Sequence, residues 1–218
     1  MKPLYITYSN GVQPYLRMAE EICRKVTELD AGDCMHICLT KPEEEKNFNI
    51  AMYSKIFAEA ERVIADRPVI ILDADHVLLK PIIKVFEGEW DIGAVYRRRC
   101  LNEYGRHDFC SGLVLLNNRR LDCITRFCHD WLTSMSSRSP SPGFCPKGLR
   151  GQGWDDTWFD DQTSLNEVIA VEDKVEFEKV YVVRNYRILP LHWKNYTRSG
   201  EGAFILHLKG GRKSKWAI

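Results

Sequence analysis

The sequence predicts an α/β fold in which a mainly parallel sheet is flanked by helices. Apolar runs alternate with amphipathic helical segments along the first part of the chain, and the run at residues 69–72 (Val-Ile-Ile-Leu) is wholly apolar. Strands that alternate with helices are typical of parallel sheets, and a continuously apolar strand indicates cover on both faces. Ligands of such sheets bind beyond the carboxyl ends of the strands.

The individual elements follow from the apolar spacing and from the residues that interrupt it. Residues 4–7 form a short apolar run that ends at Ser9-Asn10-Gly11, which predicts a strand and a turn. Pro14 opens a segment with apolar residues every three or four positions, which predicts a helix ending near Gly32. Further strands are expected at residues 35–39, 69–72, 92–95, 113–116, 180–183 and 203–208, and further helices at residues 49–65, 121–132 and 161–168.

Length and composition fit one globular domain over residues 1–218. The chain has 31 Lys and Arg against 30 Asp and Glu, a formal net charge of +1, which argues against a nucleic-acid coat or a polybasic membrane binder. No apolar run approaches the ~20 residues of a membrane-spanning helix, and the N-terminal run is too short for a signal peptide. We therefore expect a cytoplasmic protein with reduced cysteines. The segment of about residues 136–154, rich in Ser, Pro and Gly, is expected to be a long loop, either a lid or disordered.

Two carboxylates follow the apolar strand directly. Asp73 and Asp75 stand where residues 69–72 end, and alternate positions in an extended chain direct both side chains to one side. Two like charges this close repel each other unless a cation or a proton lies between them, and divalent metals are a common solution. The alternative to a metal site is an ordinary turn whose two carboxylates are solvated. The position at a strand end favours a metal site.

An Asp-x-Asp after an apolar strand also permits a phosphatase. In the haloacid-dehalogenase-like phosphatases the first carboxylate of such a motif is the nucleophile, and here that residue would be Asp73. Their motif usually follows the first strand, whereas a strand, a helix, a second strand and a second helix are expected before Asp73. The phosphatase is therefore the alternative rather than the preferred interpretation.

Four short motifs follow one another along most of the chain, at residues 69–75 (VIILDAD), 109–117 (FCSGLVLLN), 161–166 (DQTSLN) and 207–213 (HLKGGRK). In this order and spacing they resemble the motifs of the nucleotide-sugar glycosyltransferases of the GT-A fold, especially family 8, which includes glycogenin and lipopolysaccharide galactosyltransferases. The resemblance implies a single GT-A domain with a Rossmann-like sheet. It also implies transfer of a sugar from a UDP-sugar to a carbohydrate or another hydroxyl acceptor, with retention of configuration.

The resemblance implies a metal site made of Asp73, Asp75 and His207. A metal there would neutralise the charge that develops on the diphosphate leaving group. Imidazole beside carboxylates favours Mn²⁺, with Mg²⁺ as the alternative. The ordinary alternative for His207 is a surface or core histidine.

Five further positions match donor-binding positions of the family. Gly210 and Lys213 would contact the diphosphate, and Lys55 matches a position where the family commonly has a basic residue near that group. Thr7 and Tyr8 lie in the loop that would bind the uridine, where Tyr8 would stack on the base. The alternative for Gly210 and Lys213 is a solvated basic tail. The alternative for Thr7 and Tyr8 is an ordinary turn.

Asp161 and Gln162 are matched to the pair beside the donor sugar and the reaction centre. A polar pair that opens a helix can face the anomeric carbon, although Asp161 would also serve as a plain helix cap. No nucleic-acid partner is expected. A non-catalytic protein that binds nucleotide sugars is the alternative to an enzyme, and the combination of Asp73, Asp75, His207 and Lys213 argues against it.

Overall fold

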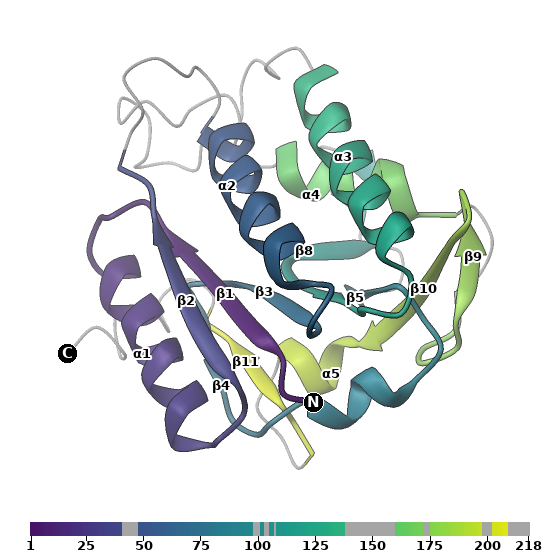
Figure 1. Ribbon diagram of the computed structural model, residues 1–218. Helices are drawn as coiled ribbons and strands as arrows, with labels where there is room; N and C mark the ends of the chain where they lie inside the picture. Colours follow the sequence, from purple (N-terminus) through teal and green to yellow (C-terminus); the bar gives the residue numbers. More distant parts are fainter. Residues whose placement is uncertain are drawn as a thin grey trace.

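The computed structural model describes residues 1–40, 48–97, 101–102, 105–106, 108–137, 160–171, 175–197 and 202–208. Within these ranges a seven-stranded sheet forms the centre of the molecule and helices cover both of its faces (Figure 1). In their spatial order the strands are β2 (Asp33–Cys38), β1 (Leu4–Ser9), β3 (Val69–Asp73), β8 (Phe109–Leu116), β5 (Ile92–Tyr96), β10 (Tyr186–His192) and β9 (Tyr181–Val183).

Most strands of this sheet run in one direction. β2, β1 and β3 are mutually parallel, and β5 and β10 point the same way because β8 is antiparallel to both β3 and β5. β9 is antiparallel to β10. The predicted α/β fold with a mostly parallel sheet is therefore confirmed. Since β8 runs against its neighbours, its first residues lie beside the carboxyl end of β3, where the paired carboxylates stand.

The apolar residues of the strands alternate between two layers. In β3, Val69 and Ile71 belong to one core and Ile70 and Leu72 to the other, as the two-residue period of a strand requires. One layer contains α2 (Phe48–Val63), α3 (Leu121–Ser137) and α4 (Asp160–Ile169), and the other contains α1 (Tyr15–Glu28), the 3₁₀-helix η1 (Ile83–Glu87), α5 (Trp193–Thr197) and the paired strands β4 (His76–Leu78) and β11 (Ile205–His207) (Figure 1).

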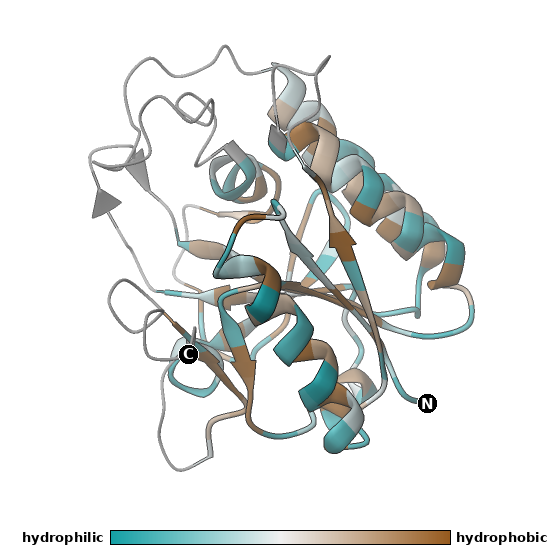
Figure 2. Cartoon of the chain, turned by 90° about the vertical axis from the view of Figure 1, so that its left-hand side faces the viewer, coloured by the Kyte–Doolittle hydropathy of each residue, from teal (hydrophilic) through white to brown (hydrophobic). Residues whose placement is uncertain are grey.

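The helices have the two-sided character that their apolar spacing predicts. Figure 2 shows hydrophilic and hydrophobic residues on different parts of the same helices. In α1, Met18, Ala19, Ile22 and Val26 are buried. Within the described ranges, no helix combines the length and the apolar character needed to cross a membrane.

Several elements differ from the sequence-based expectation, including the strands β4 and β10, which no apolar run predicted. α3 continues to Ser137, because Met135 is still a buried residue of its apolar face, and residues 138–159 of the expected loop lie outside the described residues. The strand expected at residues 203–208 is β11, which pairs with β4 in a separate two-stranded sheet rather than joining the central one. Two further short strands, β6 (Leu101–Asn102) and β7 (Gly105–Arg106), pair with each other.

Candidate active site

The chain turns sharply where β3 ends. Ala74 and Asp75 form a turn, after which the chain resumes as β4, so the extended conformation expected from Asp73 to Asp75 is not present. β4 pairs with β11 in antiparallel register, and His76 lies directly opposite His207. The backbone N–H of Leu208 also donates to the carbonyl oxygen of Asp75 at 2.7 Å. This pairing brings the last described strand to the carboxylate motif.

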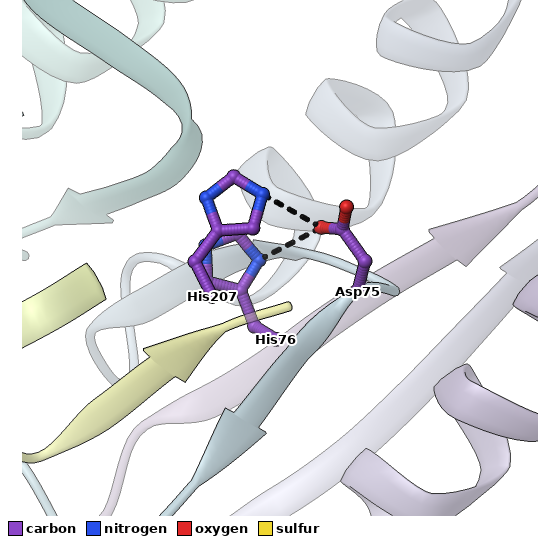
Figure 3. A group of neighbouring side chains, drawn as sticks. All are labelled: Asp75, His76 and His207. Atoms are coloured by element: carbon purple, nitrogen blue, oxygen red, sulfur yellow. Dashed lines mark ion pairs between the residues drawn. The ribbon is translucent and has the colours of Figure 1, made fainter. Parts of the chain in front are cut away.

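Asp75, His76 and His207 form a compact cluster (Figure 3). Nε2 of His207 lies 3.2 Å and Nδ1 of His76 lies 3.4 Å from the same oxygen, Oδ1 of Asp75. The two imidazole rings are stacked, with centroids 4.1 Å apart. Nδ1 of His76 is also 3.2 Å from the carbonyl oxygen of Asp73. One carboxylate and two imidazoles thus meet at the edge of the sheet.

The chemistry of this cluster suits a divalent cation. One ligand atom from each of the three residues lies within 4.8 Å of the others. Nε2 of His76 is buried and has no hydrogen-bond partner among the residues that the structure describes. Carboxylate oxygen and imidazole nitrogen together are donors that first-row transition metals prefer over an all-oxygen cage.

The electrostatics of the cluster keep its carboxylate ionised. Burial by itself raises the pKa of the Asp75 carboxyl, but the contacts with His207 and His76 outweigh burial and hold the pKa well below its ordinary value. The side chain of Asp75 is only 12% exposed. A charge this shielded from water interacts strongly with a cation placed beside it.

Asp73 lies next to this cluster and has a second neighbour in β1. The hydroxyl of Tyr8 donates to Oδ1 of Asp73, and the two residues are paired in the register of β1 and β3. Across the sheet, Gly112 of β8 faces both Asp73 and His76. A Cβ at position 112 would lie 2.7 Å from Oδ2 of Asp73 and 2.9 Å from Cε1 of His76. Glycine is therefore required there for these two side chains to lie as they do.

For the UDP and Mn²⁺ site that the resemblance implies, Gly112→Ala is expected to weaken ligand binding by about 10- to 100-fold, because overpacking costs about 1–3 kcal/mol and here displaces the side chains of the site itself. Gly93→Ala is the matched control, since its Cβ would meet only Leu115, at 3.2 Å, inside the sheet. Calorimetry on both variants measures the difference. Equal affinity in Gly112→Ala and Gly93→Ala would contradict the assignment of the site.

A second group of polar side chains continues from Tyr8 toward α4. The hydroxyl of Tyr8 is 3.0 Å from that of Tyr53, and Tyr53 in turn donates to Oδ2 of Asp161 at 3.1 Å. Trp131 of α3 donates from Nε1 to the backbone carbonyl of Asp161 at 2.8 Å. The structure thus joins Asp73, Tyr8 and Asp161, three residues singled out from the sequence, through one residue that the sequence did not single out.

Burial and hydrogen bonds act in opposite directions on the pKa of the Asp161 carboxyl. Burial raises the pKa of the Asp161 carboxyl above its ordinary value, and hydrogen bonds from the Ser111 hydroxyl and the Gln162 backbone N–H oppose that rise. Burial also raises the pKa of the Tyr53 hydroxyl well above its ordinary value, and the nearby charge of Asp161 adds to this effect. Tyr53 therefore acts as a neutral hydrogen-bond donor.

Asn166 holds α4 against β8. Its Oδ1 accepts from the backbone N–H of Phe109 at 2.8 Å, and its Nδ2 donates to the carbonyl oxygens of Phe109 and Gln162 at 2.9 and 2.7 Å. All of these contacts are buried. The asparagine that closes the motif at residues 161–166 thus fixes where Asp161 and Gln162 stand relative to the sheet.

Solved structures with a similar fold give this site a context. A glycosyltransferase involved in the glycosylation of the major capsid of PBCV-1 matches with a TM-score of 0.60 at 13% identity, over 100% of this chain and 99% of that chain. The apo structure of the bifunctional glycosyltransferase WbbM matches with a TM-score of 0.56 at 10% identity, over 96% of this chain and 46% of that chain. No protein-family model and no curated protein matches the sequence.

The chain shares the fold of these two glycosyltransferases. The GT-A-like architecture expected from the four motifs is thereby confirmed. In this fold, the clustered side chains stand at the carboxyl edge of β1 and β3, which is where ligands of open α/β sheets bind.

The predicted site residues do not all come together. Asp73, Asp75, His207, Tyr8 and Asp161 converge, and Gln162 is buried beside them at the start of α4. Thr7 is fully buried within β1 and presents no surface to a ligand. Lys55 is exposed on α2 and, two residues from Tyr53, lies about 200° around the helix from it. Gly210 and Lys213 lie outside the described residues, so their contact with a diphosphate stays a prediction.

Two residues of the site escaped the sequence reasoning. His76 follows Asp75 immediately, and this adjacency is the signal that could have identified it. Tyr53 occurs at an apolar position of a helical pattern, which is typical of a core residue, and it is indeed buried, but its hydroxyl is part of the site. The sequence does contain a signal for this role: a tyrosine instead of a phenylalanine on the buried face of a helix indicates a hydroxyl that needs a polar partner.

Proposed function

We propose that this protein is a metal-dependent glycosyltransferase that transfers a sugar from a UDP-sugar to a carbohydrate or another hydroxyl acceptor, with retention of configuration. The observation that carries the proposal is the cluster of Asp75, His76 and His207 at the carboxyl edge of a glycosyltransferase fold. Retention and the UDP moiety rest on the resemblance of the four motifs to those of glycosyltransferase family 8.

In this proposal Asp75 and His207 hold the metal, with His76 as a third ligand and Asp73 beside them. Their carboxylate and imidazole donors suit Mn²⁺ better than an all-oxygen site would. When bound, such a cation supplies charge neutralisation for a diphosphate leaving group. Gly112 leaves room for the side chains of Asp73 and His76.

The remaining residues of the site bind and orient the donor. Tyr8 is partly exposed at the end of β1, so that it can offer its ring to the uracil while its hydroxyl holds Asp73. Asp161 and Gln162 open α4 on the opposite side of Tyr53, where they would face the donor sugar. Gly210 and Lys213 would follow β11 onto the diphosphate.

The test is hydrolysis of the donor without an acceptor. With Mn²⁺ and a panel of nucleotide sugars, the protein should slowly release UDP from its matching donor, because water can take the place of the acceptor. Addition of EDTA should stop the release, and excess Mn²⁺ should restore it. We expect no hydrolysis of p-nitrophenyl phosphate, which an Asp73 nucleophile would attack. Absence of product with every donor and every divalent metal would contradict the proposal.

A further inference from the structure

Tyr53 connects two sides of the site that lie on different elements. Its hydroxyl is 3.0 Å from the Tyr8 hydroxyl of β1 and 3.1 Å from Oδ2 of Asp161 at the start of α4. Tyr8 in turn donates to Asp73 at the end of β3. The result is a continuous series of polar contacts, Asp73–Tyr8–Tyr53–Asp161, that runs from the carboxylate motif to the helix carrying the proposed reaction-centre pair.

The ring of Tyr53 is held rigidly. The residue is 1% exposed, and its ring packs against Trp131 of α3 and Phe57 of α2, with centroid distances of 4.8 and 5.6 Å. The same Trp131 donates to the backbone carbonyl of Asp161. A buried tyrosine hydroxyl needs a polar partner, and the Tyr53 hydroxyl meets those of Tyr8 and Ser111 and the carboxylate of Asp161. Packing alone would be served equally well by phenylalanine.

The direction of the hydrogen bonds makes the series act as a unit. Each tyrosine hydroxyl has a single proton, so Tyr8 and Tyr53 together can supply only two of the three contacts in the series at a time. While Tyr8 donates to Asp73, Tyr53 can donate either to Asp161 or to Tyr8. If Tyr8 no longer donates to Asp73, it can donate to Tyr53, and Tyr53 then keeps its proton for Asp161. A cation near Asp73 competes with Tyr8 for that carboxylate. The Tyr8 hydroxyl is then free to donate its proton to Tyr53 instead. The hydrogen bond that holds the Asp161 carboxylate is thereby linked to the binding of a cation beside Asp73.

We propose that Tyr53 is a positioning residue that holds the Asp161 carboxylate toward the donor sugar and, through Tyr8, links it to the metal and diphosphate side. This inference rests on the proposed function. Tyr53 itself does not need to touch the donor, so it should influence turnover more than donor affinity.

Tyr53→Phe removes only the hydroxyl and keeps the ring. It is expected to lower kcat for acceptor-independent UDP release by about 10- to 100-fold, the effect of losing one hydrogen bond to a charged group, while KM for the nucleotide sugar changes less than about twofold. The matched control is Tyr186→Phe, because Tyr186 is equally buried and its hydroxyl contacts a different carboxylate, Asp130, at 2.7 Å. Tyr186→Phe should keep kcat. Equal kcat in Tyr53→Phe and Tyr186→Phe, or a loss confined to KM, would overturn the inference.

A second measurement uses the protein without ligands. The unfolding temperatures of Tyr53→Phe, Asp161→Asn and the double variant form a cycle, and the two losses should be non-additive because both substitutions break one contact. Additive losses would overturn the inference even if the wild type is active. A wild type that releases no UDP contradicts the proposed function instead, and the cycle then still tests whether the Tyr53 hydroxyl holds the Asp161 carboxylate.

Discussion

Asp75→Asn is expected to abolish the stabilisation of the protein by Mn²⁺ with UDP. Oδ1 of Asp75 is the atom that both His207 and His76 face, at 3.2 and 3.4 Å (Figure 3), and asparagine keeps its shape while removing the charge. A ligand at 100 times its Kd stabilises the folded state by about 2.7 kcal/mol. A thermal-shift titration should show this stabilisation in the wild type and none in Asp75→Asn.

The control for this substitution is Asp66→Asn. Asp66 is exposed and precedes β3, so it lies at the opposite end of that strand from Asp75. It should respond to Mn²⁺ and UDP as the wild type does. If Asp75→Asn keeps the full shift, the cluster is not the metal site and the Asp-x-Asp motif needs another explanation.

Asn166→Ala is expected to lower the free energy of unfolding by about 2–5 kcal/mol. The substitution removes three buried hydrogen bonds, to the N–H and carbonyl of Phe109 and to the carbonyl of Gln162. Backbone groups left buried without a partner cost about 1–3 kcal/mol each. Because the same contacts locate α4 on β8, donor hydrolysis should also fall under conditions where the variant is still folded.

Asn118→Ala is the comparison for this change. Asn118 is partly exposed and its amide contacts the sulfur of Met1, at 3.9 Å, so its loss should cost less than about 0.5 kcal/mol, as is usual for surface positions. Urea denaturation of the two variants measures both values. A cost for Asn166→Ala no greater than that of Asn118→Ala would show that α4 is held by other contacts.

Much of the fold was predictable because its signals are local. The wholly apolar run before Asp73 specified a strand covered on both faces, and β3 indeed divides its side chains between two cores. The apolar spacing after Pro14 and before Arg67 specified α1 and α2 to within a few residues. The order of the four motifs was sufficient to anticipate a GT-A-like fold.

β10 is a strand that the apolar runs did not predict, and its sequence carries a local signal against a strand. Its sequence contains Pro190, whose missing N–H argues against a central strand, yet β10 pairs with β5 on one side and with β9 on the other. The antiparallel pairing with β9 covers residues 186–188 and ends before the proline. A proline is therefore tolerated at the part of the strand that this neighbour leaves unpaired.

The details of the site were not predictable because they depend on contacts between distant residues. The register between β4 and β11 places His76 opposite His207, and no property of either segment alone specifies that register. The contact between Tyr53 and Asp161 likewise joins residues 108 positions apart. Sequence patterns indicate which face of a helix is buried, but not which hydroxyl on that face meets a carboxylate.

The central claim is that Asp75 and His207 bind the metal that the donor diphosphate requires. Crystals grown with Mn²⁺ and UDP test it most directly, through an anomalous-difference map recorded at the manganese absorption edge. Our account predicts a peak within coordination distance of Asp75 and His207, with the diphosphate of UDP against it. UDP bound with no manganese peak beside these two residues, or a peak held by other side chains, would contradict the account.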